Sequence, residues 1–172
     1  MNLHQHPRTA NPTKHARVAR ISGPFGVLSA VLTGLLAGGM VLIEVVLLPF
    51  WRGIPPADFR RWFTAHAHHI RAVMIPLGMG AGVASTVATS ADLAGPGRSS
   101  RASATATAAT LGVIAITVGA SEPANHRFTA GTLTDPETRD LLQKWARWHH
   151  VRVVLGLTAT VAAMTALLNR KS

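Results

Sequence analysis

Cysteine and tyrosine are both absent from the 172-residue sequence. The absence of cysteine excludes disulfide bonds, thiolate metal ligands and thiol nucleophiles. The absence of tyrosine removes another common acid or radical carrier. Acidic side chains are also few, because seven Asp and Glu stand against 17 Lys and Arg, which gives a formal charge of +10 at pH 7.

The apolar residues gather into four long blocks instead of forming amphipathic stripes. The blocks cover residues 25–50, 72–91, 102–120 and 153–168. A soluble core does not need this segregation, whereas a bilayer does, because about 20 consecutive apolar residues cross its hydrocarbon layer. The sequence therefore predicts an all-α integral membrane protein. We expect a polar, disordered tail over residues 1–20 and one four-helix transmembrane bundle over residues 21–169.

The basic residues lie at the ends of the apolar blocks, not in one stripe, so we expect the lipid bilayer and not nucleic acid as a partner. The first block is too long for the apolar region of a signal peptide, and no cleavage site follows it. Lys and Arg are nearly balanced between the two sides, so their count does not fix the orientation. Acidic residues accompany them mainly on one side. We therefore favour a multi-pass cell-membrane protein with both termini in the cytoplasm, of open oligomeric state.

The connections between the blocks differ in length. The connection around residues 95–100, GPGRSS, is short, whereas those after the first and third blocks are long and lie on the same face. The first long connection carries residues at helical spacing, and the second carries the signals of a helix start. We expect them to extend the second and fourth spans as interfacial helices, with Thr134 or Asp135 as the cap of the latter and Pro136 at its first position.

Glu44 is the one charged residue inside the first block. It lies six residues before Phe50, which is roughly 10 Å below the end of the block at about 1.5 Å per residue. A carboxylate at that depth costs a few kcal/mol, so it should face the bundle interior. It has either a structural partner, such as Arg71 or Arg152, or a functional role.

Two further segments carry candidate residues. His66 and His69 are three residues apart and share a helix face, so they are either two metal ligands or solvated interfacial histidines. In the segment EPANH, Pro123 is expected to stop the third helix. Asn125 then either satisfies the broken helix end or holds a substrate carbonyl, with Glu122 beside it.

The densest chemistry lies in KWARWHHVRVVLGL, residues 144–157. Trp145, His149 and Arg152 follow one another at helical spacing on one face, and Trp148 and Arg152 form a second pair. An interfacial anchor explains exposed Trp and Arg residues, whereas a site explains an arginine at the start of an apolar block one turn after a histidine. We expect His149 at the helix surface. We also expect one pocket at the shared mouth of the bundle, lined by Glu44, His66, His69, Asn125, Trp145, His149 and Arg152.

The same segments carry a resemblance to a known family. They are LPFWRGIPPADFRRWF, HHIRAVMIPLG, EPANHRF and GTLTDPETRDLLQKWARWHHVR. Together with the spans between them they cover most of residues 25–165. The chain resembles the four-span bacterial membrane family of unknown-function proteins that includes anthrone oxygenase-like members.

The resemblance implies a membrane-embedded oxygenase acting on a lipophilic aromatic substrate of the anthrone type, as in aromatic polyketide biosynthesis. His149 or His66 then serves as the base, and Arg152 or Asn125 stabilises the developing oxyanion. Glu44 sets the protonation of its neighbours or binds a substrate hydroxyl. Substrate contacts then come from Trp62, Trp145, Trp148 and Glu122.

Two alternatives stay open at this point. The first concerns the cofactor: the enzyme either needs nothing beyond oxygen or holds haem or another metal through His66, His69 or His149. The other alternative is a non-enzymatic module that binds a lipophilic ligand or helps a partner assemble.

Overall fold

The computed structural model describes residues 12–94 and 100–171. Helix α1 (Pro12–Leu42) continues through the π-helical turn η1 (Ile43–Leu47) into α2 (Leu48–Gly53). The long α3 (Pro56–Ala94) follows. A second composite rod consists of α4 (Ser100–Ile116), the π-helical turn η2 (Thr117–Ser121) and α5 (Glu122–Thr129), and α6 (Asp135–Lys171) ends the fold. Because α1 begins at Pro12, residues 12–20 are helical and not part of a tail as expected, while residues 1–11 lie outside the described residues.

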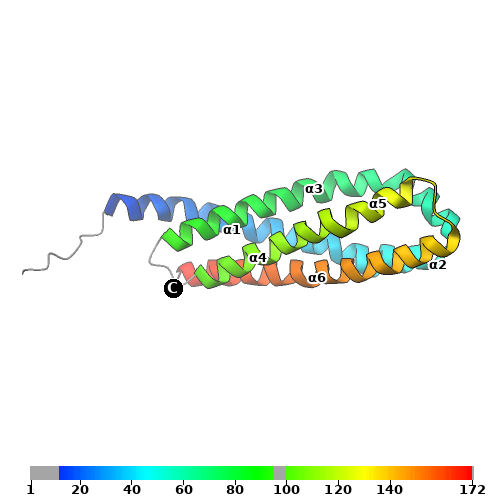
Figure 1. The fold of residues 1–172 in the computed structure, drawn as a ribbon. Coiled ribbons are helices and arrows are strands. Elements are labelled where there is room, and N and C mark those ends of the chain that lie inside the picture. Colours follow the sequence, from blue (N-terminus) through cyan, green and yellow to red (C-terminus); the bar gives the residue numbers. More distant parts are fainter. Residues whose placement is uncertain (1–11, 95–99, 172) are drawn as a thin grey trace, which may run out of the picture.

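The four rods lie side by side and alternate in direction (Figure 1). Around the bundle, α1 packs on α3, α3 on α4, α4 on α6 and α6 on α1. Both described ends of the chain lie at one end of the bundle, and the connections after α2 and α5 lie at the other. The all-α four-helix bundle predicted from the sequence is confirmed.

All four rods are long and apolar enough to cross a bilayer. They cover Gly23–Gly53, Pro56–Ala94, Arg101–Thr129 and Asp135–Arg170. Only 28–33% of the residues in the most apolar window of each rod are buried inside the protein. The remaining apolar surface is far larger than a soluble monomer exposes, so it requires lipid. The chain is a multi-pass membrane protein.

Each π-helical turn comes immediately before a Leu-Pro or Glu-Pro pair. The N–H of Leu48 donates to the carbonyl of Ile43, and the N–H of Glu122 donates to the carbonyl of Thr117, five residues back in both cases. Proline has no N–H and its ring crowds the carbonyl four residues back, so the turn before Pro49 and Pro123 widens. The helix continues beyond Pro123 to Thr129, which corrects the expectation that this proline stops it.

A group of buried aromatic rings closes the end of the bundle at the long connections. This aromatic cap consists of Trp51, Phe59, Phe63, Phe128 and Trp145, which are 1–6% exposed. Neighbouring rings pack with centroids 5.0–5.7 Å apart, mostly edge to face, a geometry that aromatic pairs favour. The cap separates the interior of the bundle from the water beside the loops.

The loop end is also fixed by polar contacts. Thr134 and Glu137 cap the start of α6 reciprocally, because the N–H of Thr134 donates to the Glu137 carboxylate and the N–H of Glu137 donates to the threonine hydroxyl. Arg60 of α3 pairs with Asp135 at 2.9 Å and donates to Thr138 at 2.6 Å. The long second and fourth rods are thereby joined at their outer ends, as extended interfacial helices.

Candidate active site

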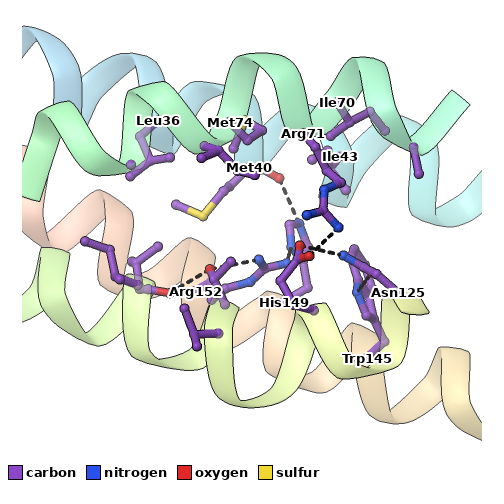
Figure 2. Close-up of a pocket in the computed structure, with 18 of the residues that line it drawn as sticks. Leu36, Met40, Ile43, Ile70, Arg71, Met74, Asn125, Trp145, His149 and Arg152 are labelled. Carbon is purple, nitrogen blue, oxygen red and sulfur yellow. Dashed lines mark hydrogen bonds and ion pairs between the residues drawn. The ribbon is translucent and has the colours of Figure 1, made fainter. Parts of the chain in front are cut away.

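A cavity of about 340 Å³ lies inside the bundle beneath the aromatic cap. Every helical rod contributes to its wall (Figure 2). The wall is mainly apolar, with residues such as Leu36, Met74 and Val113, and a few polar side chains converge at the cap end. Small-molecule sites have this form, with volumes of about 300–1,000 Å³ and few, well-placed polar groups.

The cavity reaches the surface between α3 and the rod α4–η2. Ile75, Met79 and Val118 line the cavity and are also 41%, 66% and 67% exposed. All three belong to membrane-spanning rods. Gly78 lines the same side, and a Cβ atom placed on it would meet nothing within 4 Å. The cavity therefore opens through an apolar window toward lipid, while the aromatic cap closes it toward the loops.

His149 is the most buried polar residue of the site, with 0% exposure. Its Nε2 lies 3.0 Å from the carbonyl oxygen of Met40, and its Nδ1 lies 2.8 Å from Nη2 of Arg152. A carbonyl only accepts and a guanidinium only donates, so Nε2 carries the proton and Nδ1 offers its lone pair. The imidazole is neutral in this arrangement. The expectation of a surface histidine is wrong.

Arg152 joins His149 to two other elements. Its Nη1 donates to the hydroxyl of Thr117 in η2 at 3.2 Å, and its guanidinium carbon lies 5.5 Å from the centre of the Trp145 ring. Trp145 stacks on His149 with ring centroids 4.8 Å apart and planes 11° apart. The helical spacing of these three α6 residues thus places them on one buried face.

A second polar cluster lies beside this group. Arg71 of α3 and Glu122 form an ion pair at 2.5 Å, and Glu122 also accepts a hydrogen bond from Asn125 at 3.1 Å. The amide oxygen of Asn125 accepts from the indole N–H of Trp145 at 3.0 Å. Figure 2 shows Arg71, Asn125, Trp145 and His149 together at the cap end of the cavity.

The charges of the site do not cancel. Arg71 and Glu122 neutralise one another, and His149 is neutral. Among the described residues, no carboxylate lies within 4.0 Å of the Arg152 guanidinium, whose side chain is nine-tenths buried. The Nε of Arg152 and the indole N–H of Trp51 are buried without a hydrogen-bond partner within the described chain. The wall therefore offers one net positive charge and two donors to a ligand with an anionic oxygen.

Glu44 lies outside the cavity wall, which corrects the expectation that it lines the pocket. Its carboxylate is 3.8 Å from Nε2 of His149 and 3.4 Å from Nδ1 of His150. It pairs with neither Arg71 nor Arg152, the partners that the sequence suggested. The π-helical turn η1 changes the helical face at this point, so Glu44 lies behind His149 as seen from the cavity.

The histidines of α3 also lie away from the cavity. His66 and His69 are exposed, so their expected place in the pocket wall is wrong. The ring of His66 stacks on Trp62, and its Nδ1 donates to the Trp62 carbonyl at 2.8 Å, while His69 lies against His68. Within the described ranges no group of three or more His, Asp or Glu is arranged to hold a metal ion. Trp62 and Trp148, the latter 49% exposed, do not line the cavity either.

Three residues of the wall with a nitrogen or oxygen atom in the side chain were not candidates from the sequence. Trp51 and Thr117 belong to the cap and to η2, and Arg71 was considered only as a partner of Glu44. Arg71 stands directly before the second apolar block, as Arg152 stands at the start of the fourth. A basic residue at the start of each of two spans that run in the same direction is a signal that would have placed Arg71 at the same end of the bundle as Arg152.

Comparison with known proteins gives one result. The family model described as anthrone oxygenase matches residues 59–162, well over half of the chain. This range includes Arg71, Glu122, Asn125, His149 and Arg152, but not the first rod. No curated protein and no solved structure gives a significant match.

Proposed function

We propose, because the chain belongs to the anthrone oxygenase family, that it oxidises a lipophilic aromatic substrate of the anthrone type with dioxygen inside the membrane. One observation carries the proposal. The buried Arg152, which has no carboxylate partner among the described residues, lies on the wall of an apolar cavity that opens toward lipid. Such a site suits a flat apolar molecule that develops one negative oxygen.

The chemistry of an anthrone fits these groups. Loss of a proton from its methylene carbon gives an aromatic enolate whose charge lies largely on oxygen. Arg152 binds that oxygen, which draws its Nη2 away from His149 and frees the Nδ1 lone pair to accept the proton. The electron-rich carbon then reacts with dioxygen. One oxygen atom becomes the new carbonyl, and the other leaves as water with the two methylene hydrogens.

The remaining residues hold and shield the substrate. Trp145 keeps the ring of His149 in place by stacking on it, and its own N–H is fixed by Asn125. The N–H of Trp51 is available for a second substrate oxygen. The aromatic cap excludes water, which strengthens the attraction between Arg152 and an oxyanion. The finer assignment, a monooxygenase of aromatic polyketide biosynthesis, belongs to this proposal.

The test uses the full chain purified in lipid nanodiscs with an anthrone as substrate. Oxygen uptake and quinone formation are followed for the wild type, Arg152→Lys and His149→Ala. Arg147→Lys is the matched control, because Arg147 is an exposed arginine of the same helix. We expect roughly a 100-fold loss of turnover in Arg152→Lys, since lysine cannot donate to two acceptors in the plane of a guanidinium. Thermal melting checks the folding of each variant.

The outcomes separate the alternatives. Equal turnover in all four proteins would remove Arg152 and His149 from the mechanism. Binding of the substrate without oxidation in the wild type would favour a lipophilic-ligand-binding module. A visible absorption spectrum and metal analysis of the active protein test for haem or another metal. Both ring nitrogens of His149 are already in hydrogen bonds, so binding of a metal by His149 would require one of these hydrogen bonds to break.

A further inference from the structure

The proton that His149 would accept has a route to the surface. Glu44 lies behind the imidazole, and its Oε2 is buried without a hydrogen-bond partner in the described structure, 3.8 Å from Nε2 of His149. Its Oε1 lies 3.4 Å from Nδ1 of His150, whose side chain is 68% exposed. His149, Glu44 and His150 thus form a continuous line from the cavity wall to the outside of the bundle.

We propose that Glu44 and His150 relay protons between His149 and interfacial water, an inference that rests on the proposed function. Glu44 is a carboxylate deep in a membrane-spanning rod. An ionisable residue at that position costs free energy, and such residues are usually retained for a function. Within 4.0 Å of its carboxylate the titratable groups of the described residues are His149 and His150, both from α6. In the described chain, α1 and α2, the helices on either side of η1, contribute none. The contact is therefore dedicated to these two histidines.

Electrostatics favours the transfer. A proton on Nδ1 makes His149 a cation directly beside the Arg152 guanidinium, and two cations in contact repel strongly in a low-dielectric site. Passing the Nε2 proton to Glu44 leaves a neutral imidazole and a neutral carboxyl group. Only a small tilt of the ring is needed, because Nε2 now donates to Met40 at 3.0 Å and the Glu44 oxygen is 3.8 Å away.

The steps balance in both directions. The substrate C–H bond breaks and its proton joins Nδ1, while the Nε2–H bond breaks and that proton joins Glu44. After rotation of its carboxyl group, Glu44 passes the proton to Nδ1 of His150, which releases one to water. Formation of water from dioxygen later requires a proton at the substrate. The return of one proton along the same line supplies it and restores the original tautomer of His149.

The test measures proton release without oxygen, so that it does not depend on oxidation. An anthrone is mixed anaerobically with the protein in nanodiscs, in weak buffer with a pH-indicator dye, while the absorbance of the substrate anion is recorded. Wild type should form the anion and release a proton for each substrate bound. His150→Ala should slow this release about 10-fold, and Glu44→Gln by roughly 100-fold, within the range that proton-transfer groups contribute.

Rescue by imidazole separates a relay from a structural role. Added imidazole should restore the rate of His150→Ala, because the missing group is exposed, but not that of Glu44→Gln, because the oxygen that faces His149, Oε2, is buried. His68→Ala is the control, since it removes an exposed histidine of α3 outside the line. Thermal melting confirms folding, and the exposed position of His150 makes its variant the decisive one.

Each result decides the inference. Wild-type release in His150→Ala and Glu44→Gln, or a loss in His150→Ala that imidazole does not restore, overturns the relay alone. Absence of anion and proton release in the wild type overturns both the relay and the assignment of His149 as base. Anaerobic release followed by no oxidation in air leaves the relay standing and overturns the proposed oxidation.

Discussion

The imidazole of His149 donates to the carbonyl oxygen of Met40 across a distance of 3.0 Å, which joins α6 to α1 at the wall of the cavity. The other ring nitrogen accepts from Arg152, which in turn reaches Thr117 on the third rod. His149 and Arg152 together therefore link three rods. The residue proposed as the base also holds the bundle together at the level of the site.

His149→Ala should accordingly lower stability as well as turnover. The substitution removes two buried hydrogen bonds and leaves a cavity, which together cost about 2–4 kcal/mol of unfolding free energy. Thermal unfolding in a mild detergent measures the effect, with His150→Ala as the control at an exposed position. A melting temperature equal to that of the wild type would show that the Met40 and Arg152 contacts contribute nothing.

Arg152 should select ligands with an ionisable oxygen. We expect an anthrone or anthraquinone with a free hydroxyl group to bind more tightly than its methyl ether, by about 1.5–3 kcal/mol for a hydrogen bond to a charged group. Arg152→Gln should remove most of this preference while leaving the affinity for the ether nearly unchanged. Tryptophan fluorescence titration in nanodiscs measures both affinities. A preference that survives in the variant would assign the recognition of the oxygen to another donor, such as the N–H of Trp51.

The fold followed from the sequence because its main signal is local. The segregation of apolar residues into four blocks predicts membrane spans without knowledge of any contact. The π-helical turns were not predicted, although their cause is also local. Pro49 follows η1, and Pro123 follows η2. Pro123 was expected to end its helix, whereas both rods continue through the proline with one widened turn.

The site was only partly predictable because its residues depend on rotation between rods. Helical spacing alone places Trp145, His149 and Arg152 on one face. Whether Glu44 lies in front of or behind His149 depends on the extra residue in η1, which no hydropathy pattern contains. His66 was expected in the pocket wall because of its position along the span, but it lies on a helix face that is exposed. The depth of a residue along a span can therefore be predicted from the sequence, whereas the direction in which its side chain faces depends on how the rods pack.

A buried ion pair should stabilise the end of the bundle opposite the site. Arg170 binds Asp92 through Nε at 3.0 Å and Nη2 at 2.5 Å, and Ser103 donates to the same carboxylate. Asp92→Asn should cost about 3–5 kcal/mol, because it leaves a largely buried guanidinium without its counter-charge. The double variant Asp92→Asn/Arg170→Met should recover part of that loss. Melting temperature measures stability, and turnover per folded molecule should stay at the wild-type value in both.

The absence of cysteine allows a clean test of topology. We expect Pro55→Cys and Thr132→Cys to react with a membrane-impermeant maleimide from the same side, since both positions are exposed at the loop end. If both termini are cytoplasmic, this side is the outside of an intact cell. Ala94→Cys, at the opposite end, should react only after the membrane is opened. Labelling of positions 55 and 132 from different sides is incompatible with the bundle.

Gly78 should control entry of the substrate from the bilayer. It lines the cavity beside Ile75 and Met79, and a Cβ atom on it meets nothing within 4 Å, so a larger side chain enters the window without a clash. Gly78→Leu should therefore slow binding of a bulky tricyclic substrate. It should not lower the melting temperature, because replacing a mid-helix glycine gains up to about 1 kcal/mol of helix propensity.

Gly38→Leu is the matched control, since Gly38 also has open space around its Cβ position but does not line the cavity. Stopped-flow measurement of the association rate in nanodiscs compares both variants with the wild type. Equal rates in all three would mean that the substrate reaches Arg152 by another path, and slower binding in Gly38→Leu alone would place that path between other rods.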